Sequence, residues 1–258
     1  MIPKNIFQTW KTSHVPDKWK EAQMSVIEKN PDYNYKLFTD DDNINIVTHY
    51  FPDFLETYTQ LKQNIQRADA IRYMYMYIWG GIYLDLDYVA LRSFDEIHLH
   101  KPVGLINTNN FRKTTTNSFL MSKPRQGIWL RCLKEIKIPS PWWIRWSPGL
   151  DVLHTTGPNM LHKVYIQQPN DVEKLSNIVS PCDVCQLYVS HKQSCQLPEE
   201  TSPFILYQIP GASWNDYDMK IMNALYCYRY HILIIYLLVV FIPLIILMCI
   251  YMKDIKIR

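Results

Sequence analysis

Two aspartates, Asp85 and Asp87, stand at the end of an apolar segment in which apolar and other residues alternate over positions 82–87. That alternation is typical of a strand with one apolar face. Because side chains two positions apart on a strand point the same way, both carboxylates are expected to converge. Paired carboxylates can hold a hard divalent cation such as Mn²⁺ or Mg²⁺ and leave other coordination positions open for phosphate. The sequence therefore predicts a metal site at Asp85 and Asp87.

A helix predicted over residues 66–79 precedes this strand, and Gly80-Gly81 ends it. Its apolar residues recur at helical spacing and predict one buried stripe; they are Ala68, Ile71, Tyr75 and Ile78. Asp69 and Arg72 share a face of the helix because they are three positions apart. The helix is therefore expected to deliver a further acid and a base to the region of the metal.

The run of residues 68–87 resembles the fingerprint of glycosyltransferase family 32, whose members carry an Asp-x-Asp sugar-nucleotide motif. The matching residues are Ala68-Asp69-x-x-Arg72-Tyr73 and Gly80-Gly81-Ile82-Tyr83-Leu84-Asp85-Leu86-Asp87. The family includes the initiating α-1,6-mannosyltransferase of the yeast Golgi and inositol phosphoceramide mannosyltransferases. The resemblance implies an α/β fold with a Rossmann-like nucleotide-binding domain of the GT-A type.

The resemblance also implies an activity and assigns residues to it. The chain would be a metal-dependent retaining glycosyltransferase that moves mannose from GDP-mannose to a glycolipid or sphingolipid headgroup, or to a glycan. Asp85 and Asp87 would hold Mn²⁺ or Mg²⁺ against the diphosphate of the sugar nucleotide. Asp69 and Arg72 would position the donor sugar and its phosphate, and Tyr83 would pack beside them.

Two further segments resemble family elements near the donor. Trp10 ends a segment similar to the family's opening strand, and is a candidate to stack on the nucleotide base or to be a core tryptophan. Residues 156–159, Thr-Gly-Pro-Asn, resemble a turn placed near the donor sugar. The alternative for that turn is a simple helix start with proline at the first position.

A last family element is the segment Gly211-Ala212-Ser213-Trp214, in which Ser213 and Trp214 would close over the leaving group. Family members commonly carry a histidine just upstream that helps to hold the metal or the diphosphate. Residues 207–210 of this chain are Tyr-Gln-Ile-Pro. The histidine is therefore missing or replaced by Gln208, which would weaken metal binding.

Length and composition fit one catalytic domain over residues 1–225. The chain has 258 residues, of which 48% are hydrophobic, and a net charge of +3. This charge is too small, and too evenly spread, to indicate a nucleic-acid partner. A predicted helix over residues 16–30, a strand over 33–38 and an acidic helix start at 39–42 give the strand–helix rhythm of a nucleotide-binding layer.

Residues 103–106 predict a short buried strand and 118–122 a further one, with a polar loop over 107–117. Residues 142–146 are more unusual, because three tryptophans surround an arginine between Pro141 and Pro148. Such a segment could be a platform for the acceptor, a loop that faces a membrane, or packing between subdomains.

Cysteines and one histidine cluster late in the domain, at Cys182, Cys185, His191 and Cys195. These residues could close a structural zinc site. A disulfide between two of the three cysteines, or free thiols, are the alternatives, and the compartment decides among them.

Residues 232–251 contain no charged side chain, and twenty apolar residues are enough to span a bilayer as a helix. We therefore predict a transmembrane helix over 231–252 and a short basic tail over 253–258, which makes the chain a single-pass protein of Golgi or ER membranes. The side that the domain faces is not settled by the sequence, which favours the cytosolic side slightly. Basic residues after the span favour a lumenal domain, whereas the missing signal peptide and missing glycosylation sequons favour a cytosolic one.

Two other classes of function fit parts of the sequence. Residues 82–89 resemble the nucleophile strand of haloacid-dehalogenase-type phosphatases, in which Asp85 would be phosphorylated. A non-catalytic membrane protein that binds sugar through the same motif is the other alternative. A panel of sugar nucleotides with Mn²⁺ would separate the three.

Overall fold

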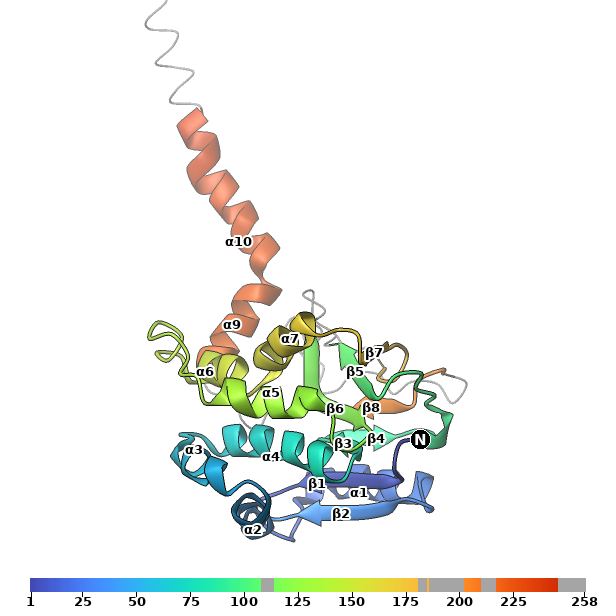
Figure 1. Cartoon of the computed structure of the whole chain (residues 1–258). Coiled ribbons are helices and arrows are strands. Elements are labelled where there is room, and N and C mark those ends of the chain that lie inside the picture. Colours follow the sequence, from blue (N-terminus) through green and yellow to red (C-terminus); the bar gives the residue numbers. More distant parts are fainter. Residues whose placement is uncertain (108–113, 181–184, 186–201, 210–216, 246–258) are drawn as a thin grey trace, which may run out of the picture.

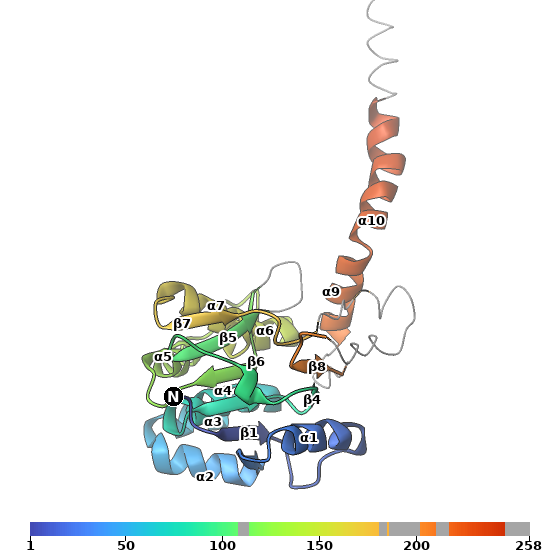
Figure 2. The same ribbon diagram turned by 90° about the vertical axis from the view of Figure 1, so that its right-hand side faces the viewer.

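A six-stranded mixed sheet with helices on both faces forms the centre of the computed structural model (Figures 1 and 2). The structure describes residues 1–107, 114–180, 185, 202–209 and 217–245. The strand order is β2-β1-β3-β6-β5-β7. The strands are β1 (Asn5–Thr9), β2 (Asn34–Phe38), β3 (Gly81–Leu84), β5 (Val103–Asn107), β6 (Thr115–Ser122) and β7 (Val172–Leu175). A second sheet pairs β4 (Tyr88–Ala90) with β8 (Leu206–Gln208).

The first half of the sheet is parallel, since β1 pairs in parallel with both β2 and β3. Helix α1 (Asp17–Lys29) connects β1 to β2, and α2 (Asp40–Tyr50), η1 (Pro52–Phe54), α3 (Leu55–Gln60) and α4 (Asn64–Ile78) lie between β2 and β3. The rhythm predicted for residues 1–87 is thus confirmed. The carboxyl ends of β1, β2 and β3 meet at one edge, where ligands bind in open α/β sheets.

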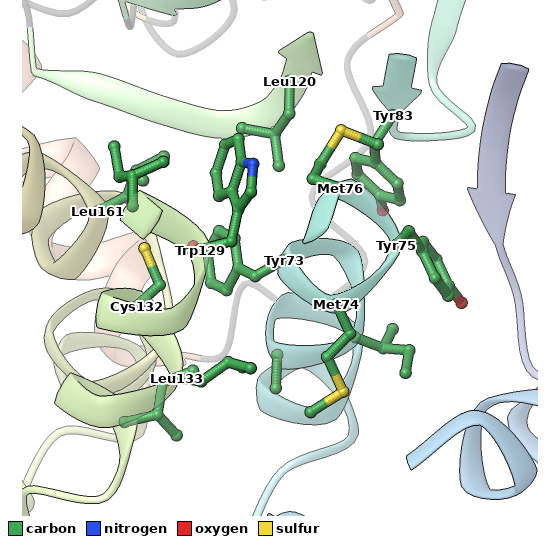
Figure 3. Close-up of a cluster of buried hydrophobic side chains, with 14 of the residues drawn as sticks. Tyr73, Met74, Tyr75, Met76, Tyr83, Leu120, Trp129, Cys132, Leu133 and Leu161 are labelled. Atoms are coloured by element: carbon green, nitrogen blue, oxygen red, sulfur yellow. The ribbon is translucent and has the colours of Figure 1, made fainter. Parts of the chain in front are cut away.

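One face of the sheet is covered by α2, α4, α5 (Gly127–Ile136) and α7 (Pro158–Gln167). Figure 3 shows the centre of this layer, where Tyr73 of α4 lies beside Trp129 of α5, with ring centroids 6.0 Å apart. Helix α4 is confirmed, but its burial is wider than the single stripe predicted. Nine consecutive or near-consecutive residues of it are buried, because it packs against both the sheet and α5.

The opposite face packs against α1, β4 and the 3-10 turn η2 (Phe94–Glu96). Ile82 and Leu84 of β3 point into this second core, whereas Tyr83 points into the first. The prediction of one apolar face for this strand was therefore wrong. A sheet that is covered on both sides buries every residue of its central strands, whatever their alternation.

The other local predictions agree with the structure in part. Residues 39–42 begin α2 as predicted, with a capping box between Thr39 and Asp42. The predicted strand over 103–106 is β5. The polar loop over 107–117 is shorter than predicted, because β6 already begins at Thr115.

Gly80 and Gly81 join α4 to β3 in a conformation that L side chains rarely adopt, with φ of 62° and 111°. A Cβ on Gly81 would lie 2.6 Å from the Asn5 carbonyl oxygen. We therefore expect Gly81→Ala to lower the free energy of unfolding by roughly 2–4 kcal/mol, since backbone strain and overpacking add. Denaturant unfolding followed by circular dichroism measures the change.

Gly127→Ala is the matched control for this substitution. Gly127 is the first residue of α5, and a Cβ there would meet no atom closer than 3.7 Å, the distance to Arg131 Nη1. Unchanged stability is expected for it. Equal losses in the two variants would show that the turn at Gly81 does not require glycine.

The C-terminal part of the chain leaves the domain through helices. Within the domain, helix α6 (Pro148–Thr155) precedes α7. The helices that leave the domain are α9 (Tyr217–Cys227), α10 (Arg229–Tyr236) and a π-helical segment η3 (Leu237–Phe241). No single helix among the residues described is long and apolar enough to cross a bilayer, but two segments bent by 63°, Tyr217–Cys227 and Arg229–Ile245, meet that criterion together. The predicted span over 231–252 is thus described only as far as residue 245.

Candidate functional site

Asp85 and Asp87 lie at the carboxyl end of β3, in the turn that leads to β4. They are not on the strand itself, so the predicted strand alternation is not what brings them together. The turn is fixed by two backbone hydrogen bonds, from Asp85 N to Ser118 O at 3.0 Å and from Tyr88 N to Asp85 O at 3.4 Å. Both aspartates nevertheless lie at the edge where β1, β2 and β3 end.

Arg72 of α4 lies under this turn and is 3% exposed. Its Nη1 is 3.3 Å from Asp85 Oδ1, and its Nη2 is 3.2 Å from Asp69 Oδ1. The same Nη1 donates to the carbonyl oxygen of Asn117 at 2.9 Å, and the guanidinium lies 4.7 Å from the centroid of the Tyr83 ring. The structure therefore brings Asp69, Arg72, Tyr83 and Asp85 together.

The carboxylate of Asp69 is buried, and both of its oxygens are hydrogen-bonded within the protein. Asn117 Nδ2 donates to Oδ1 at 2.9 Å, and Thr156 Oγ1 donates to Oδ2 at 2.8 Å. Burial raises the pKa of Asp69 to about 6, although Arg72 and Thr156 act in the opposite direction. The turn at 156–159 is a helix start with proline at the first position, since Pro158 begins α7. Thr156 contacts Asp69, and a place beside the donor sugar stays a prediction.

Asp85 is the more accessible of the two aspartates, with 32% of its side chain exposed. The hydroxyl of Tyr83 donates to its Oδ1 at 2.7 Å. Its backbone oxygen accepts from Nε2 of Gln8, a buried residue of β1, at 3.2 Å. One carboxylate of the site is thus held from beneath by Arg72 and Tyr83 and open to solvent on its other side.

Asp87 is buried, and its Oδ2 accepts from Nε2 of Gln208 at 3.2 Å. The pairing of β4 with β8 explains this contact, because it places Tyr88 opposite Gln208, and Ile209 N donates to Asp87 O at 2.8 Å. Within the part of the chain that the structure describes, Asp87 Oδ1 has no hydrogen-bond partner. Burial and then the charge of Asp85 raise the pKa of Asp87 to about 7.

These two carboxylates fit a divalent cation. A cation would supply the partner that the buried Oδ1 of Asp87 lacks and would reduce its repulsion with Asp85. No group of three or more histidine, cysteine, aspartate or glutamate side chains suited to a metal occurs among the described residues. Two carboxylates suffice where substrate phosphates complete the coordination, as is usual for Mg²⁺.

Trp10 follows β1 and lies next to the turn with the two aspartates. It meets Trp19 edge-on, with centroids 5.0 Å apart, and packs on a small cluster that includes Leu86, the residue between Asp85 and Asp87. The ring is partly exposed. This placement is compatible with contact to a base. The other predicted donor-site residues at the C-terminal end, Ser213 and Trp214, are outside the described ranges.

The structure contradicts the predicted zinc site at one of its four residues, Cys185. Cys185 forms a disulfide with Cys227 at the end of α9, 42 positions away. A disulfide sulfur is not a thiolate, so Cys185 cannot be a zinc ligand in this state, and its disulfide partner is not one of the clustered cysteines. The spacing within 182–195 could not reveal a partner so distant in sequence. Cys182, His191 and Cys195 are not among the residues that the structure describes.

The sequence did not identify Asn117, Thr156 or Gln8 as parts of one polar network. Asn117 contacts both Asp69 and Arg72, and Gln8 contacts the backbone of Asp85. Each is an ordinary polar residue at the end of a strand or helix, which gives no local signal. Whether a position on β1 or β6 is buried depends on contacts with neighbouring strands and with the helices that cover the sheet, and these contacts are tertiary.

Residues 16–103 match a family model described as "Glycosyltransferase sugar-binding region containing DXD motif". The mannosyl phosphorylinositol ceramide synthase SUR1 of Saccharomyces cerevisiae is 35% identical over 229 residues, which are 87% of this chain and 55% of that protein. Inositol phosphoceramide mannosyltransferase 3 of Schizosaccharomyces pombe is 36% identical over 164 residues, 64% of this chain and 45% of that protein. The chain spans about half the length of these curated relatives.

Two solved structures share the fold. PaToxG glycosyltransferase superposes with a TM-score of 0.53 and 20% identity, over 65% of this chain and 70% of that one. The UDP-bound glycosyltransferase domain of the YGT toxin gives a TM-score of 0.50 and 11% identity, over 67% and 79%. At such identities the likeness concerns the fold alone, and it supports the α/β architecture expected of GT-A-like glycosyltransferases.

Proposed function

Since this chain is related to the glycosyltransferases with a DXD sugar-binding region, we propose that it is a metal-dependent retaining mannosyltransferase with GDP-mannose as donor. The observation that carries the proposal is the unpartnered buried oxygen of Asp87 beside the exposed carboxylate of Asp85. The match over residues 16–103, which include Asp85, favours sugar transfer over the phosphatase alternative.

The residues divide into two roles. Asp85 and Asp87 would hold Mn²⁺ or Mg²⁺, which when bound would offset the negative charge on the departing diphosphate. Asp69 and Arg72 are buried, and their polar atoms are occupied by Asn117, Thr156 and Asp85. We therefore assign both as positioning residues that fix Asp85 for the donor, and not as groups that touch the sugar in this state.

A lipid headgroup is the acceptor we propose, with a protein-linked glycan as the alternative. Two of the relatives are named for the synthesis of mannosylated inositol phosphoceramides. The side chains described over residues 232–245 are exposed and uncharged, as in a segment that lies in lipid. An anchor of this kind, over residues 231–252, would keep the site near lipid acceptors.

The Cys185–Cys227 disulfide bears on the side of the membrane. Disulfides persist in oxidising compartments and are rare in the cytosol. The pairing therefore supports a domain in the lumen of the Golgi or ER, and it weighs against the cytosolic side that the sequence favoured.

Incubating the 258-residue chain with a panel of sugar nucleotides, Mn²⁺ and inositol phosphoceramide vesicles tests the proposed function. We expect release of GDP from GDP-mannose and mannosylated lipid. Release of inorganic phosphate from phosphate monoesters would indicate the phosphatase, and saturable binding without turnover would indicate the non-catalytic alternative.

A chain that ends at residue 228 tests the part played by the anchor. This end point keeps Cys227 and its disulfide, which a cut at 226 would remove. Slow hydrolysis of GDP-mannose is expected to be unchanged, because Asp85 and Asp87 remain. Transfer to vesicle lipid should fall at least about tenfold, since tethering raises the local acceptor concentration. Equal transfer by both forms, or preference for a soluble oligosaccharide, would contradict the lipid acceptor.

A further inference from the structure

Three tryptophans project from the tryptophan loop, which we define as residues 141–147 between α5 and α6. Trp142 and Trp143 are each 62% exposed, and Trp146 is 83% exposed. The ring of Trp142 meets the rings of Trp143 and Trp146 edge-on, with centroids 5.8 and 6.3 Å away. A monomeric soluble protein rarely displays such a contiguous group of large apolar side chains unless the surface binds something.

The loop has a defined backbone. Its turns are closed by hydrogen bonds from Ile144 N to Pro141 O at 3.0 Å and from Ser147 N to Ile144 O at 3.1 Å. Ser147 then caps α6 by accepting from Leu150 N. The tryptophans are thus presented by an ordered turn, which lowers the conformational entropy lost when they bind.

The loop is also fastened to the helix that leaves the domain. Asp218 of α9 accepts hydrogen bonds from Ser147 Oγ and, at 2.9 Å, from Gly149 N. Figure 1 shows the loop before α6 on the side of the domain from which α9 and α10 depart. Beyond α9, exposed apolar side chains continue through α10 and η3. The tryptophan loop and the apolar C-terminal helix therefore belong to one side of the molecule.

We propose that the tryptophan loop is a second membrane contact, which inserts Trp142, Trp143 and Trp146 into the interfacial region of a lipid bilayer. Tryptophan prefers this region because its ring is apolar and its N–H is polar. The loop contains no acidic residue, and its one charged side chain, Arg145, is exposed and suits anionic headgroups. Continuity with the apolar segment over 232–245 favours lipid over a protein partner.

Docking at this loop would fix the orientation of the site, and this consequence rests on the proposed function. Helix α6 has 8 residues and spans roughly 12 Å at 1.5 Å per residue. The tryptophan loop is at its start, and Thr156, which contacts Asp69, follows its end. A lipid headgroup of a bilayer that contacts the loop would therefore be close enough to extend toward Asp85.

Fluorescence quenching in vesicles tests the contact. The 258-residue chain is reconstituted into phosphatidylcholine vesicles whose acyl chains are brominated near the headgroup, and into unbrominated vesicles. Three of the eight tryptophans lie in the loop, so roughly three-eighths of the emission should be quenched. The variant with all three replaced by serine should lose this quenching and keep its melting temperature, because the three side chains are exposed.

Ile166→Ser is the matched control, since Ile166 is 59% exposed on α7 and lies outside the loop. It should leave quenching unchanged. Equal fractional quenching in the triple variant and the native chain would overturn the proposal. In detergent, weaker quenching of the loop tryptophans by iodide at higher protein concentration would also overturn the proposal. It would identify a second copy of the chain as the partner that covers the loop.

The measurement needs no turnover, so the two proposals fail separately. Quenching by brominated lipid in a chain that transfers no sugar would refute only the proposed function. An active chain whose loop is not quenched would refute only the membrane contact. If both hold, the triple serine variant should transfer mannose to vesicle lipid several-fold more slowly, with hydrolysis of GDP-mannose unchanged.

Discussion

Sugar transfer is expected to fall at least about a hundredfold when either Asp85 or Asp87 is replaced by asparagine, because loss of a bound cation removes several kcal/mol of transition-state stabilisation. Both carboxylates would hold the same ion, so the double variant should be no worse than either single one. Initial rates with GDP-mannose and vesicle acceptor give the comparison. Partial losses that multiply in the double variant would refute a shared cation.

A second readout separates loss of the metal from loss of the fold. Mn²⁺ should raise the melting temperature of the native chain, since a ligand that binds only the folded state stabilises it. The shift should disappear in Asp87→Asn. Asp41→Asn is the control, because Asp41 is an exposed acid in the first turn of α2, and both its rate and its metal-induced shift should remain native.

The pKa of Asp87 adds a prediction for the same variant without metal. The pKa of Asp87 is about 7 in the folded chain, and its ordinary value is 3.8. As the pH rises between these two values, Asp87 ionises in the unfolded chain but stays protonated in the folded one, which lowers the free energy of unfolding. Asp87→Asn removes this unfavourable ionisation. The metal-free variant should therefore melt higher than the native chain near about pH 8, and this difference should vanish near about pH 4.

Removal of the Arg72 side chain should have the largest effect on stability. Arg72→Met leaves the buried carboxylate of Asp69 without its cation and the carbonyl of Asn117 without its donor. Breaking a buried ion pair on one side costs about 3–5 kcal/mol, since the remaining charge is uncompensated. Urea unfolding measures the loss. Transfer should fail as well, because Arg72 also holds Asp85.

The partner variants make this prediction specific. Asp69→Asn should cost less than Arg72→Met, because Arg72 keeps Asp85 as a partner. Arg72→Met combined with Asp69→Asn should be more stable than Arg72→Met alone, since the side chain at position 69 is then neutral. Lys163→Met, which breaks an exposed pair with Glu135, should cost about 1 kcal/mol or less. Similar losses at Arg72 and Lys163 would contradict the buried pair.

The sequence by itself determined most local elements and singled out the charged residues of the candidate site. Helical spacing predicted α4 and placed Asp69 and Arg72 on one face, and both contact each other in the structure. Gly80-Gly81 predicted the break before β3, and the acidic run predicted the start of α2. Such features depend on neighbours three or four positions away, so they can be recognised in a linear pattern.

Only the tertiary structure decided how far the site extends and what surrounds it. Gln208 reaches Asp87 because β8 pairs with β4, and Thr156 reaches Asp69 across 87 positions. The disulfide partner of Cys185 and the burial of β3 on both faces likewise depend on segments far apart in the chain. Periodicity shows that a side chain faces an interior. Which group it meets there depends on how sheets and helices pack, and that is not encoded in any local window.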